Sequence, residues 1–398
     1  MSANIPVLNR SVGQPTEASV HERYAAAAET LQVSLCCPIE YSPDLLNVIP
    51  QEVIERDYGC GDPTPYVRPG ETVLDLGSGG GKLCFIAAQL VGPGGRVIGV
   101  DCNQPMLSLA RKHAPTVAQR LGYKNVEFRY GLIQDLCLDL DLLGEQLAGH
   151  PVSDPASYLE LRNREEQLRC QSPLIPDISV DCVLSNCVLN LVRQRDRSQL
   201  FREIFRVLKP GGRAAISDIV SDQDVPAAWQ QDAELWSGCL SGAYREDAFG
   251  RAFEEAGFHG IQIVKRQQEP WRTIEGIEFR SVTVVAYKAS HEPPLERNQA
   301  VIYRGPFKKV EDDHGWGYIR GERMAVSDHT FERLQREPYQ QMFDMIEPAR
   351  PVALQDAAPF AAGVGARRDA GESKQGGTSP AMVQSIGSCC GNGSPCCE

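Results

Sequence analysis

The stretch ETVLDLGSGGGKLCFIAAQL, residues 71–90, determines which fold the sequence predicts. Its first part, Thr72–Leu76, is a short apolar run typical of a buried strand, and the glycine-rich turn Gly77–Gly81 follows directly. Beyond the turn, apolar residues recur at helical spacing, at Leu83, Ile86, Ala87 and Leu90. The pattern ends at Gly92, as helices commonly end at glycine. A strand, a glycine turn and a helix in this order predict the start of a βαβ unit.

The same alternation continues toward the carboxyl end. Apolar runs predict further strands at Arg96–Val100, Val126–Tyr130, Val180–Ser185 and Ala214–Ile219. A helix that starts with Pro105 is expected to break or end near Pro115, because proline lacks the backbone N–H that a helix interior needs. Asp196 is expected to cap another helix. The apolar stripe of that helix consists of Leu200, Ile204 and Leu208.

The next segment predicts how the sheet closes. A polar segment that contains Cys239 is expected to be helical. A further helix is marked by three apolar residues, Phe249, Phe253 and Ala256. Two strand-like runs follow, at Ile261–Lys265 and Ser281–Tyr287. The predicted fold class is therefore α/β, a doubly wound Rossmann-like sheet with a terminal antiparallel strand pair.

The first part of the chain divides into an amino-terminal segment and the main domain. Residues 1–55 form the segment, which carries Cys36 and Cys37, and residues 56–288 form the domain. A charged, weakly patterned stretch at residues 136–176 interrupts the βα alternation. We interpret this stretch as a surface insertion and assign it no function.

Beyond the main domain, a linker at Ser290–Pro294 leads into a small α+β module at residues 295–350. Within that module we expect a strand at Ala300–Tyr303 and a helix capped by Asp328. Residues 351–398 are rich in Ala, Gly, Ser and Pro, and we expect them to form a disordered tail that carries cysteines.

The composition excludes several classes of partner. The 398 residues include 52 acidic and 40 basic side chains, which gives a formal net charge of -12. Such a surface repels polyanions, so nucleic acid and anionic membranes are not expected partners. The sequence also lacks the run of about 18 apolar residues that a membrane span requires. We expect a soluble, cytoplasmic protein, and the sequence does not indicate its oligomeric state.

The glycine turn predicts a nucleoside-binding site. Glycines let a ligand approach the backbone closely, and Asp101, at the end of the second strand, can accept hydrogen bonds from both ribose hydroxyls. The spacing alone fits a dinucleotide or S-adenosylmethionine. Three features favour S-adenosylmethionine: Asp75, which is placed to contact its amino-acid end, the turn Leu208–Gly212 before the fifth strand, and the antiparallel strand pair. Together these features resemble class I methyltransferases.

Three of the fourteen cysteines lie beside turns where a ligand would bind. Cys187 directly follows the fourth strand, at the sheet edge where ligands collect in open α/β folds. Cys60 and Cys239 lie on segments able to fold over that edge. Three thiolates suit a soft ion, whereas closed zinc sites usually have four ligands, and this region contains no CxxC and no paired His. Arsenic(III) is soft and trigonal-pyramidal, and its lone pair is able to attack an electrophilic methyl group.

The cysteine motifs, taken with the glycine turn, resemble arsenite methyltransferases. The resemblance covers about Leu31 to Tyr287 and extends more weakly to about residue 350. It is carried by YGCG at 58–61, LDLGSG at 74–79, SNCVLNL at 185–191, LW at 235–236, CLSGA at 239–243 and the cysteine-rich carboxyl end.

The resemblance implies a ligand set for arsenic and one for S-adenosylmethionine. Cys60, Cys187 and Cys239 would hold trivalent arsenic, and Cys239 would lie on an arsenic-binding segment at about 221–245. Cys36 or Cys37 would be an additional redox thiol. The cofactor would be lined by Asp75, Gly77, Ser78, Gly79, Asp101, Met106, Ile133 and Asn186. This chain departs from the family at Asp57, where an aromatic residue is common, and at Gly238, where a glutamate is common.

The implied reaction is methylation of arsenite to methylarsenite and then to dimethylarsenite, a form of arsenic detoxification. The arsenic lone pair carries no proton, so no general base is needed. Methyl transfer formally oxidises arsenic, and a trivalent product requires two electrons. A disulfide between Cys60 and either Cys36 or Cys37 would supply them. A thioredoxin-like protein or glutathione would then reduce that disulfide.

Two other functions fit parts of the sequence. A class I methyltransferase acting on carbon or oxygen of another small molecule would usually need a general base near the fourth strand, and Asn186-Cys187 offers none. A thiol-rich metalloid-binding protein would have no need for Asp75, the glycine turn and Asp101 together. Cofactor binding separates this second alternative from an enzyme.

Overall fold

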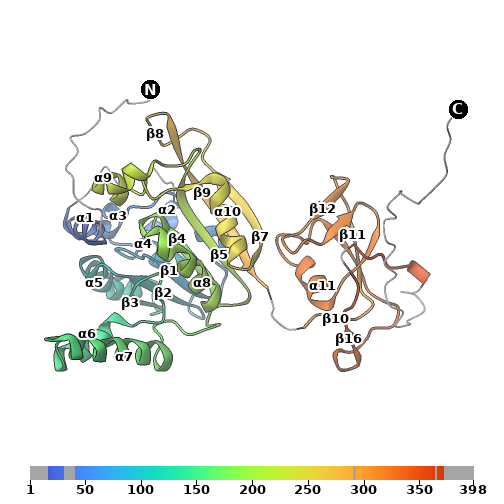
Figure 1. The fold of residues 1–398 in the computed structure, drawn as a ribbon, viewed down its shortest axis with the longest axis horizontal. Helices are drawn as coiled ribbons and strands as arrows, with labels where there is room; N and C mark the ends of the chain where they lie inside the picture. Colours follow the sequence, from blue (N-terminus) through green and yellow to red (C-terminus); the bar gives the residue numbers. More distant parts are fainter. Residues whose placement is uncertain (1–16, 31–40, 290–292, 364, 372–398) are drawn as a thin grey trace. The chain divides into compact units, whose positions relative to one another are not determined.

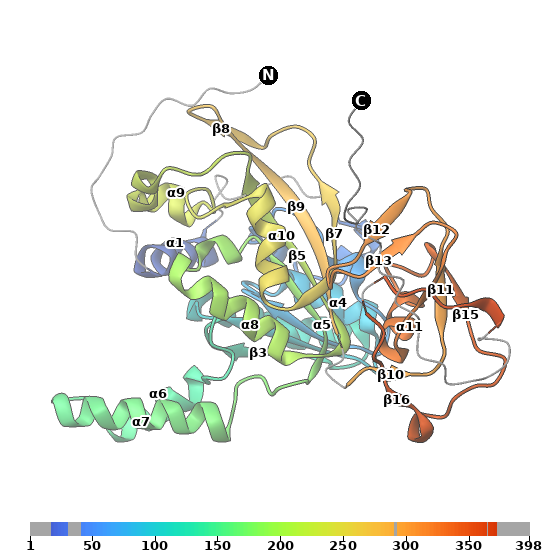
Figure 2. The same ribbon diagram turned by 45° about the vertical axis from the view of Figure 1, so that its right-hand side comes forward.

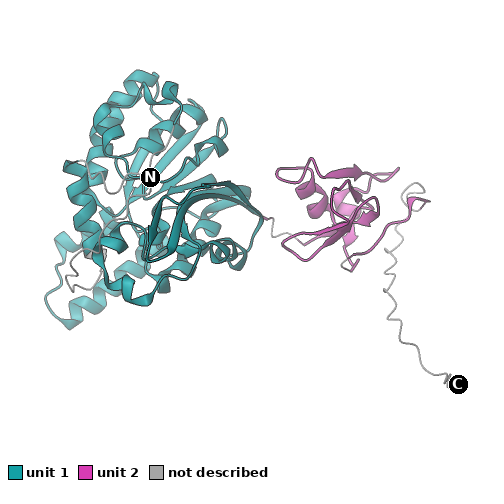
Figure 3. Cartoon of the chain, turned by 90° about the horizontal axis from the view of Figure 1, so that it is seen from above, with its two compact units in different colours: residues 1–288 teal, residues 289–398 magenta. Residues whose placement is uncertain are grey.

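The protein is described by a computed structural model that covers residues 17–30, 41–289, 293–363 and 365–371. The chain forms two compact units, residues 1–288 and 289–398 (Figure 3). Cys36, Cys37 and the cysteines of the carboxyl tail lie outside the described residues. None of the helices in the described part of the chain is both long and apolar enough to cross a membrane.

The first unit is built on a nine-stranded sheet, in which seven strands follow the order β3-β2-β1-β4-β5-β9-β7 and the short strands β6 and β8 pair with β5 and β9 (Figure 1). The first five of these strands run parallel, whereas β9 runs antiparallel to both β5 and β7. The strands are β1 (Thr72–Leu76), β2 (Arg96–Asp101), β3 (Val126–Tyr130), β4 (Val180–Asn186), β5 (Leu208–Ser221), β6 (Tyr244–Arg245), β7 (Phe258–Arg266), β8 (Arg272–Ile274) and β9 (Ile277–Lys288). The predicted fold class is confirmed.

Helices cover both faces of this sheet. Successive strand residues point to opposite faces, so each face carries apolar side chains that the helices bury. Cys182 of β4 packs in one core with α4 and α5, and the adjacent Val183 packs in the other core with α8 and α10. The helices are α1 (Glu17–Glu29), α2 (Pro43–Leu46), α3 (Gln51–Glu55), α4 (Lys82–Val91), α5 (Gln104–Leu121), α6 (Leu140–Gly149), α7 (Pro155–Gln171), α8 (Arg197–Val207), α9 (Ala233–Ser237) and α10 (Glu246–Glu255).

Three helix predictions were wrong in detail. Helix α5 continues through Pro115 to Leu121, because apolar residues on both sides of the proline are buried against the sheet and offset the missing hydrogen bond. Asp196 stands at the first position before α8, but its side chain makes no capping hydrogen bond, and Leu208 belongs to β5. Cys239 lies just after the short helix α9 rather than inside a helix.

The stretch at residues 136–176 forms a helical hairpin, α6 and α7, which extends away from the sheet (Figure 2). Asp139 caps α6 and Asp154 caps α7, and each side chain accepts a hydrogen bond from a backbone N–H. The two helices share a small leucine core. That core is narrow and most of α7 is exposed, which explains the weak apolar pattern in the sequence.

The second unit has its own core and three small sheets. Its elements are β10 (Leu295–Glu296), β11 (Ala300–Tyr303), β12 (Lys309–Glu311), β13 (Gly317–Ile319), β14 (Arg323–Ala325), α11 (Asp328–Leu334), β15 (Phe343–Ile346) and β16 (Ala358–Pro359). Ser327, rather than Asp328, caps α11. The unit extends past residue 350, because β16 pairs with β10 and the buried Arg368 forms two hydrogen bonds to Glu296 at 2.7 and 2.8 Å.

Candidate functional site

A cavity of about 360 Å³ opens at the carboxyl ends of β1, β2 and β4. Ligands collect at this edge in open α/β sheets. All of the residues that we predicted to line the cofactor also line this cavity: Asp75, Gly77, Ser78, Gly79, Asp101, Met106, Ile133 and Asn186. The first strand, the glycine turn and the start of α5 supply most of them, so a contiguous part of the sequence builds most of this site.

The glycine turn has the backbone geometry that the sequence predicted. Gly77 has φ of 69°, in the left-handed region that side chains rarely adopt, and an added Cβ there would lie 2.5 Å from Val188. The turn is fixed to the second strand, because the N–H groups of Gly77 and Ser78 both donate to the carbonyl of Val100 at 2.8 and 3.0 Å. The backbone of the turn therefore faces the cavity directly.

Asp101 is held rigidly at the end of β2. Its Oδ2 accepts a hydrogen bond from the N–H of Gly79 at 2.8 Å, and its Oδ1 accepts one from the N–H of Asn103 at 2.8 Å. Burial raises the pKa of this carboxyl group, and these backbone N–H groups act in the opposite direction. The backbone N–H of Cys102 also acts on this carboxylate, which with its four lone-pair sites still has capacity to accept a hydrogen bond from a ligand hydroxyl.

Asp75 lies deeper in the cavity wall, with 2% of its surface exposed. Burial, and to a smaller extent the nearby carboxylates of Asp57 and Asp101, raises its pKa to about 8, while the Cys84 thiol, which donates to it at 3.2 Å, lowers that pKa. Lys82 does not neutralise this charge, because its ammonium group pairs with Asp57. A cationic ligand group beside Asp75 would stabilise the ionised carboxylate.

The thiols of Cys60, Cys187 and Cys239 lie in one buried cluster beside this cavity, with exposed fractions of 6%, 8% and 2%. None of the three forms a disulfide with another described residue. Cys187 is central, because its thiol is within hydrogen-bonding reach of both the other two. It also lines the cavity, and the Cys239 thiol donates to its carbonyl at 3.2 Å. The structure thus brings together the three cysteines that the sequence singled out.

The backbone at two of these cysteines is strained. Cys187 and Cys239 both have φ of 62°, in the left-handed region that costs a side-chain-bearing residue about 1–2 kcal/mol. Backbone hydrogen bonds hold each residue there: Cys187 donates to Ser217 at 2.8 Å and Cys239 donates to Trp236 at 3.0 Å. Such strain is found at functional sites more often than elsewhere.

Asn186 lines the cavity, but its amide group also holds the loop that carries Cys60. Its Oδ1 accepts hydrogen bonds from the N–H groups of Cys60 and Gly61 at 2.8 and 3.1 Å, and its Nδ2 donates to the carbonyl of Gly61 at 2.7 Å. A Cβ on Gly59 would lie 2.2 Å from that Nδ2. The residue that we expected only beside the cofactor therefore also positions a thiol.

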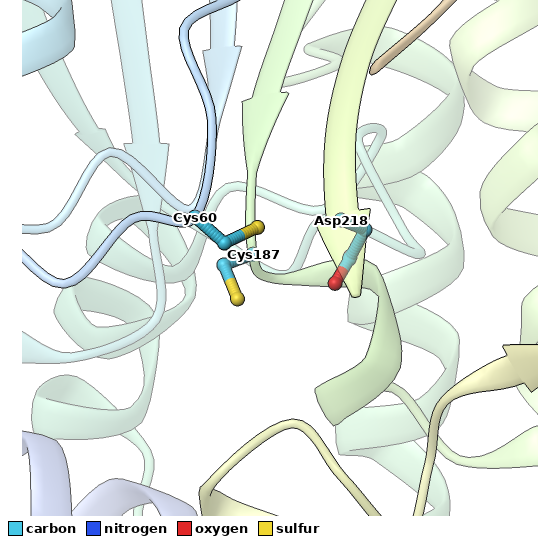
Figure 4. A group of neighbouring side chains, drawn as sticks. All are labelled: Cys60, Cys187 and Asp218. Carbon is cyan, nitrogen blue, oxygen red and sulfur yellow. The ribbon is translucent and has the colours of Figure 1, made fainter. Parts of the chain in front are cut away.

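The sequence analysis missed Asp218, a carboxylate inside the thiol cluster. Figure 4 shows it at the end of β5, facing Cys60 and Cys187, and the ligand atoms of these three residues lie within 4.8 Å of one another. Burial raises the pKa of Asp218 to about 6. The available signal was a single acidic residue near the carboxyl end of an otherwise apolar strand.

Tyr24 of α1 was also missed. It lines the cavity, and its hydroxyl lies within hydrogen-bonding reach of the Cys239 thiol. Helix α1 lies beside α9 in Figures 1 and 2, and Arg23 joins the two by donating to the carbonyl of Glu234 and the hydroxyl of Ser237 at 2.9 and 2.6 Å. The amino-terminal helix therefore contacts both the cavity and the segment that carries the third thiol.

The pKa of each of two thiols lies well above the ordinary value. For Cys187, the hydrogen bond with Cys239 acts in the lowering direction, but hydrogen bonding and charge interaction with Cys60, together with burial, raise the pKa overall. For Cys239, hydrogen bonding with Cys187 and burial raise the pKa. Both thiols are therefore protonated at neutral pH before a ligand binds.

Family comparisons agree with this geometry. Residues 68–172 and 166–257 match a family described as a methyltransferase domain, and residues 290–378 match a domain of unknown function. An arsenite methyltransferase of Aquipseudomonas alcaligenes is 34% identical over 69% of this chain and 72% of its own length. The human arsenite methyltransferase is 30% identical over 77% of this chain and 74% of its own length.

A solved structure gives the same result. The crystal structure of an arsenic(III) S-adenosylmethionine methyltransferase from Chlamydomonas reinhardtii superposes with a TM-score of 0.53 and 27% identity, covering 80% of this chain and 99% of the other. The fold, the cavity at the strand ends and the extent of these matches all point to the same family. The chain belongs to the arsenite methyltransferase family, whose members are S-adenosylmethionine-dependent enzymes.

Proposed function

We propose that this enzyme methylates trivalent arsenic while Cys60, Cys187 and Cys239 hold it, converting arsenite to methylarsenite and then to dimethylarsenite. The observation that carries this proposal is the position of Cys187. Its thiol is adjacent to both other thiols and also lines the cavity that fits the methyl donor. An atom bound to Cys187 is therefore next to the cavity.

The state of the thiols fits capture of arsenite without loss of protons to solvent. Arsenite is neutral As(OH)₃ at neutral pH, and each protonated thiol that forms an As–S bond releases one hydroxyl group as water. Three thiols thus give an uncharged As(SR)₃ unit and three waters. A neutral product suits this cluster, because burial of an unpaired charge is unfavourable.

On the donor side, two carboxylates are placed to recognise different parts of S-adenosylmethionine. Asp101 would accept hydrogen bonds from the ribose hydroxyls, and Asp75 would pair with the ammonium group of the amino-acid end. When bound, S-adenosylmethionine supplies an electrophilic methyl group on a sulfonium. Met106 and Ile133 add apolar walls to the cavity, and these exclude water around the reacting atoms.

The arsenic lone pair is the nucleophile, and the three sulfur donors keep it electron-rich. No proton leaves arsenic as the As–C bond forms, so a general base is not required. The contribution of the protein is to hold arsenic at a fixed place next to the methyl donor, an effect that is worth about 7–11 kcal/mol at best.

The redox step completes the proposal. Methyl transfer leaves arsenic formally pentavalent and positively charged. The thiol of a second cysteine then attacks the Cys60 sulfur, the As–S bond to Cys60 breaks and leaves its electron pair on arsenic, and one proton is released as the disulfide forms. We assign this role to Cys60 with Cys36 or Cys37, which lie outside the described residues. A thioredoxin-like protein or glutathione then reduces the disulfide.

The test is methylation of two substrates by three single variants, with S-adenosylhomocysteine release and mass spectrometry of the arsenic products as readouts. Arsenite has three exchangeable positions, whereas methylarsenite has only two. Cys60→Ser should therefore lose methylation of arsenite but retain some methylation of methylarsenite. Cys187→Ser and Cys239→Ser should lose both. Full activity of Cys187→Ser on arsenite would overturn the proposal, and equal losses in all variants would remove the division of roles.

A further inference from the structure

The thiol cluster contains a donor that arsenic does not require. Arsenic(III) is satisfied by three sulfurs, yet Asp218 places a carboxylate oxygen within 4.8 Å of the Cys60 and Cys187 sulfurs (Figure 4). Asp218 has no exposed surface, and the two cysteines are 6% and 8% exposed. Two thiols and a carboxylate converging at a buried point are a donor set for a divalent cation.

Asp218 is held by hydrogen bonds to both of its carboxylate oxygens. Its Oδ1 accepts two hydrogen bonds, from Asn190 Nδ2 and from the N–H of Ile219, each at 2.8 Å. Its Oδ2 accepts a hydrogen bond from the N–H of Leu189 at 2.9 Å, and the backbone N–H of Asn190 also acts on this carboxylate. A metal ion at Oδ2 would therefore take the place of one of these N–H donors.

These hydrogen bonds also orient the carboxylate before any ion arrives. Leu189 and Asn190 lie on the turn after β4, whereas Ile219 follows Asp218 in β5, so two separate segments fix the group. Hydrogen bonds of this kind to a ligating carboxylate commonly change metal affinity by about 10–100-fold. Asp218 is thus preorganised rather than free to turn away.

We propose that Cys60, Cys187 and Asp218 form a binding site for a thiophilic divalent cation such as Zn²⁺ or Cd²⁺, which excludes arsenite and so inhibits methylation. This inference rests on the proposed function only in that the same thiols serve both ligands. The sequence argued against zinc because a fourth ligand was missing. Asp218 supplies an oxygen ligand, which gives a set of three protein ligands and leaves the fourth position of a tetrahedral site for water.

The charges of the two complexes differ, and this difference separates them experimentally. Two thiolates and a carboxylate carry three negative charges, and a bound divalent ion neutralises two of them. Binding releases two thiol protons and involves no redox change. The arsenic complex is neutral and uses sulfur alone. Removing the Asp218 charge should therefore weaken the cation much more than it weakens arsenite.

The experiment is a Cd²⁺ titration of the reduced full-length protein, followed by the sulfur-to-cadmium absorbance in the ultraviolet. Asp218→Asn should weaken Cd²⁺ by at least about tenfold and arsenite by less than about threefold. Asp224→Asn is the matched control, because it removes an exposed carboxylate from the same segment of the chain and should leave both affinities unchanged. Equal Cd²⁺ affinity for folded Asp218→Asn and wild type would overturn the site.

A second measurement keeps the inference testable if Asp218→Asn does not fold. In the wild-type enzyme, Zn²⁺ should inhibit methylation competitively with arsenite and non-competitively with S-adenosylmethionine, and Cys60→Ser should weaken Cd²⁺ binding. Competition with S-adenosylmethionine instead would refute the site. If arsenite itself fails to bind these thiols, the proposed function fails, whereas the Cd²⁺ titration still tests the cation site independently.

Discussion

The two halves of the active site are built in different ways. The donor cavity comes mainly from one contiguous region, from β1 through the glycine turn to the start of α5. The thiol cluster comes from residues far apart in sequence, Cys60, Cys187, Asp218 and Cys239, which only the folded sheet brings together. A local motif thus builds most of the proposed donor site, whereas the proposed acceptor site depends on the complete tertiary structure.

The two halves also differ in charge. The cavity presents the carboxylates of Asp75 and Asp101 to a cationic donor, whereas the cluster presents thiols that are protonated before substrate binds. In the proposed reaction, Asp101 would face the cationic sulfonium donor, whereas the protonated thiols would exchange with neutral arsenite. Variants that affect one half and leave the other intact test this separation.

The largest expected effect is on the acceptor half. Cys187→Gly removes the central thiol but suits the φ of 62° at this position, since glycine adopts it freely. Turnover should fall by at least about 10²-fold because arsenic is no longer held in place. Affinity for S-adenosylmethionine, measured by calorimetry, should remain near that of wild type, and the melting temperature should not drop as it would for a residue that strains the backbone.

Asp101→Ala should impair the donor half and leave the acceptor half intact. Losing this carboxylate costs about 1.5–3 kcal/mol for a charged hydrogen bond, which corresponds to roughly 10–150-fold weaker S-adenosylmethionine binding. The arsenic–thiolate absorbance should be unaffected. Asp101→Asn serves as the control, because it keeps one oxygen acceptor and should lie between Ala and wild type. Unchanged cofactor affinity in the Ala variant would contradict the role of Asp101.

Asp75 should give the donor half a pH dependence. Its pKa is raised from an ordinary 3.8 to about 8, so between these values the folded protein keeps a proton that the unfolded chain has lost. Stability from this group is therefore complete below about pH 4 and is lost as pH rises toward 8, with a slope of up to about 1.4 kcal/mol per pH unit.

The Asp75→Asn variant shows whether that slope comes from this residue. In thermal unfolding without cofactor, wild type should lose stability relative to the variant between pH 6.5 and 7.5. Saturating S-adenosylmethionine should reduce the difference, because its ammonium group would pair with the ionised carboxylate. Parallel stability curves for the two proteins would show that Asp75 is not the source.

The smallest expected effect concerns the helix that contacts both halves. Tyr24→Phe removes the hydroxyl near Cys239 but keeps the ring, which packs edge-on against Tyr58 with centroids 6.2 Å apart. Arsenite affinity should fall by a few-fold, in line with about 0.5–1.5 kcal/mol for one hydrogen bond. Cofactor affinity should change less. An equal loss of both affinities would mean that Tyr24 acts by supporting α1.

The sheet was predictable because buried strands and amphipathic helices leave periodic apolar patterns, as at Thr72–Leu76 and Val180–Asn186. Long-range packing is not visible in such patterns, which is why the continuation of α5 through Pro115 was missed. Cys60 and Cys239 were found because glycines flank them, and Cys187 was found because it directly follows the fourth strand. Asp218 was missed because a carboxylate inside a strand shows its partners only after two strands are placed side by side.

The amide of Asn186 has a consequence for how this sequence can diverge. It joins the Cys60 loop to the Cys187 turn across 126 positions of the chain, and it tolerates no side chain at Gly59. The two segments can therefore be replaced only together, although they lie far apart in the sequence. A recombination event between them that brings in a different partner for either segment would lose the thiol geometry at once, so grafting this site onto another methyltransferase scaffold requires both segments together.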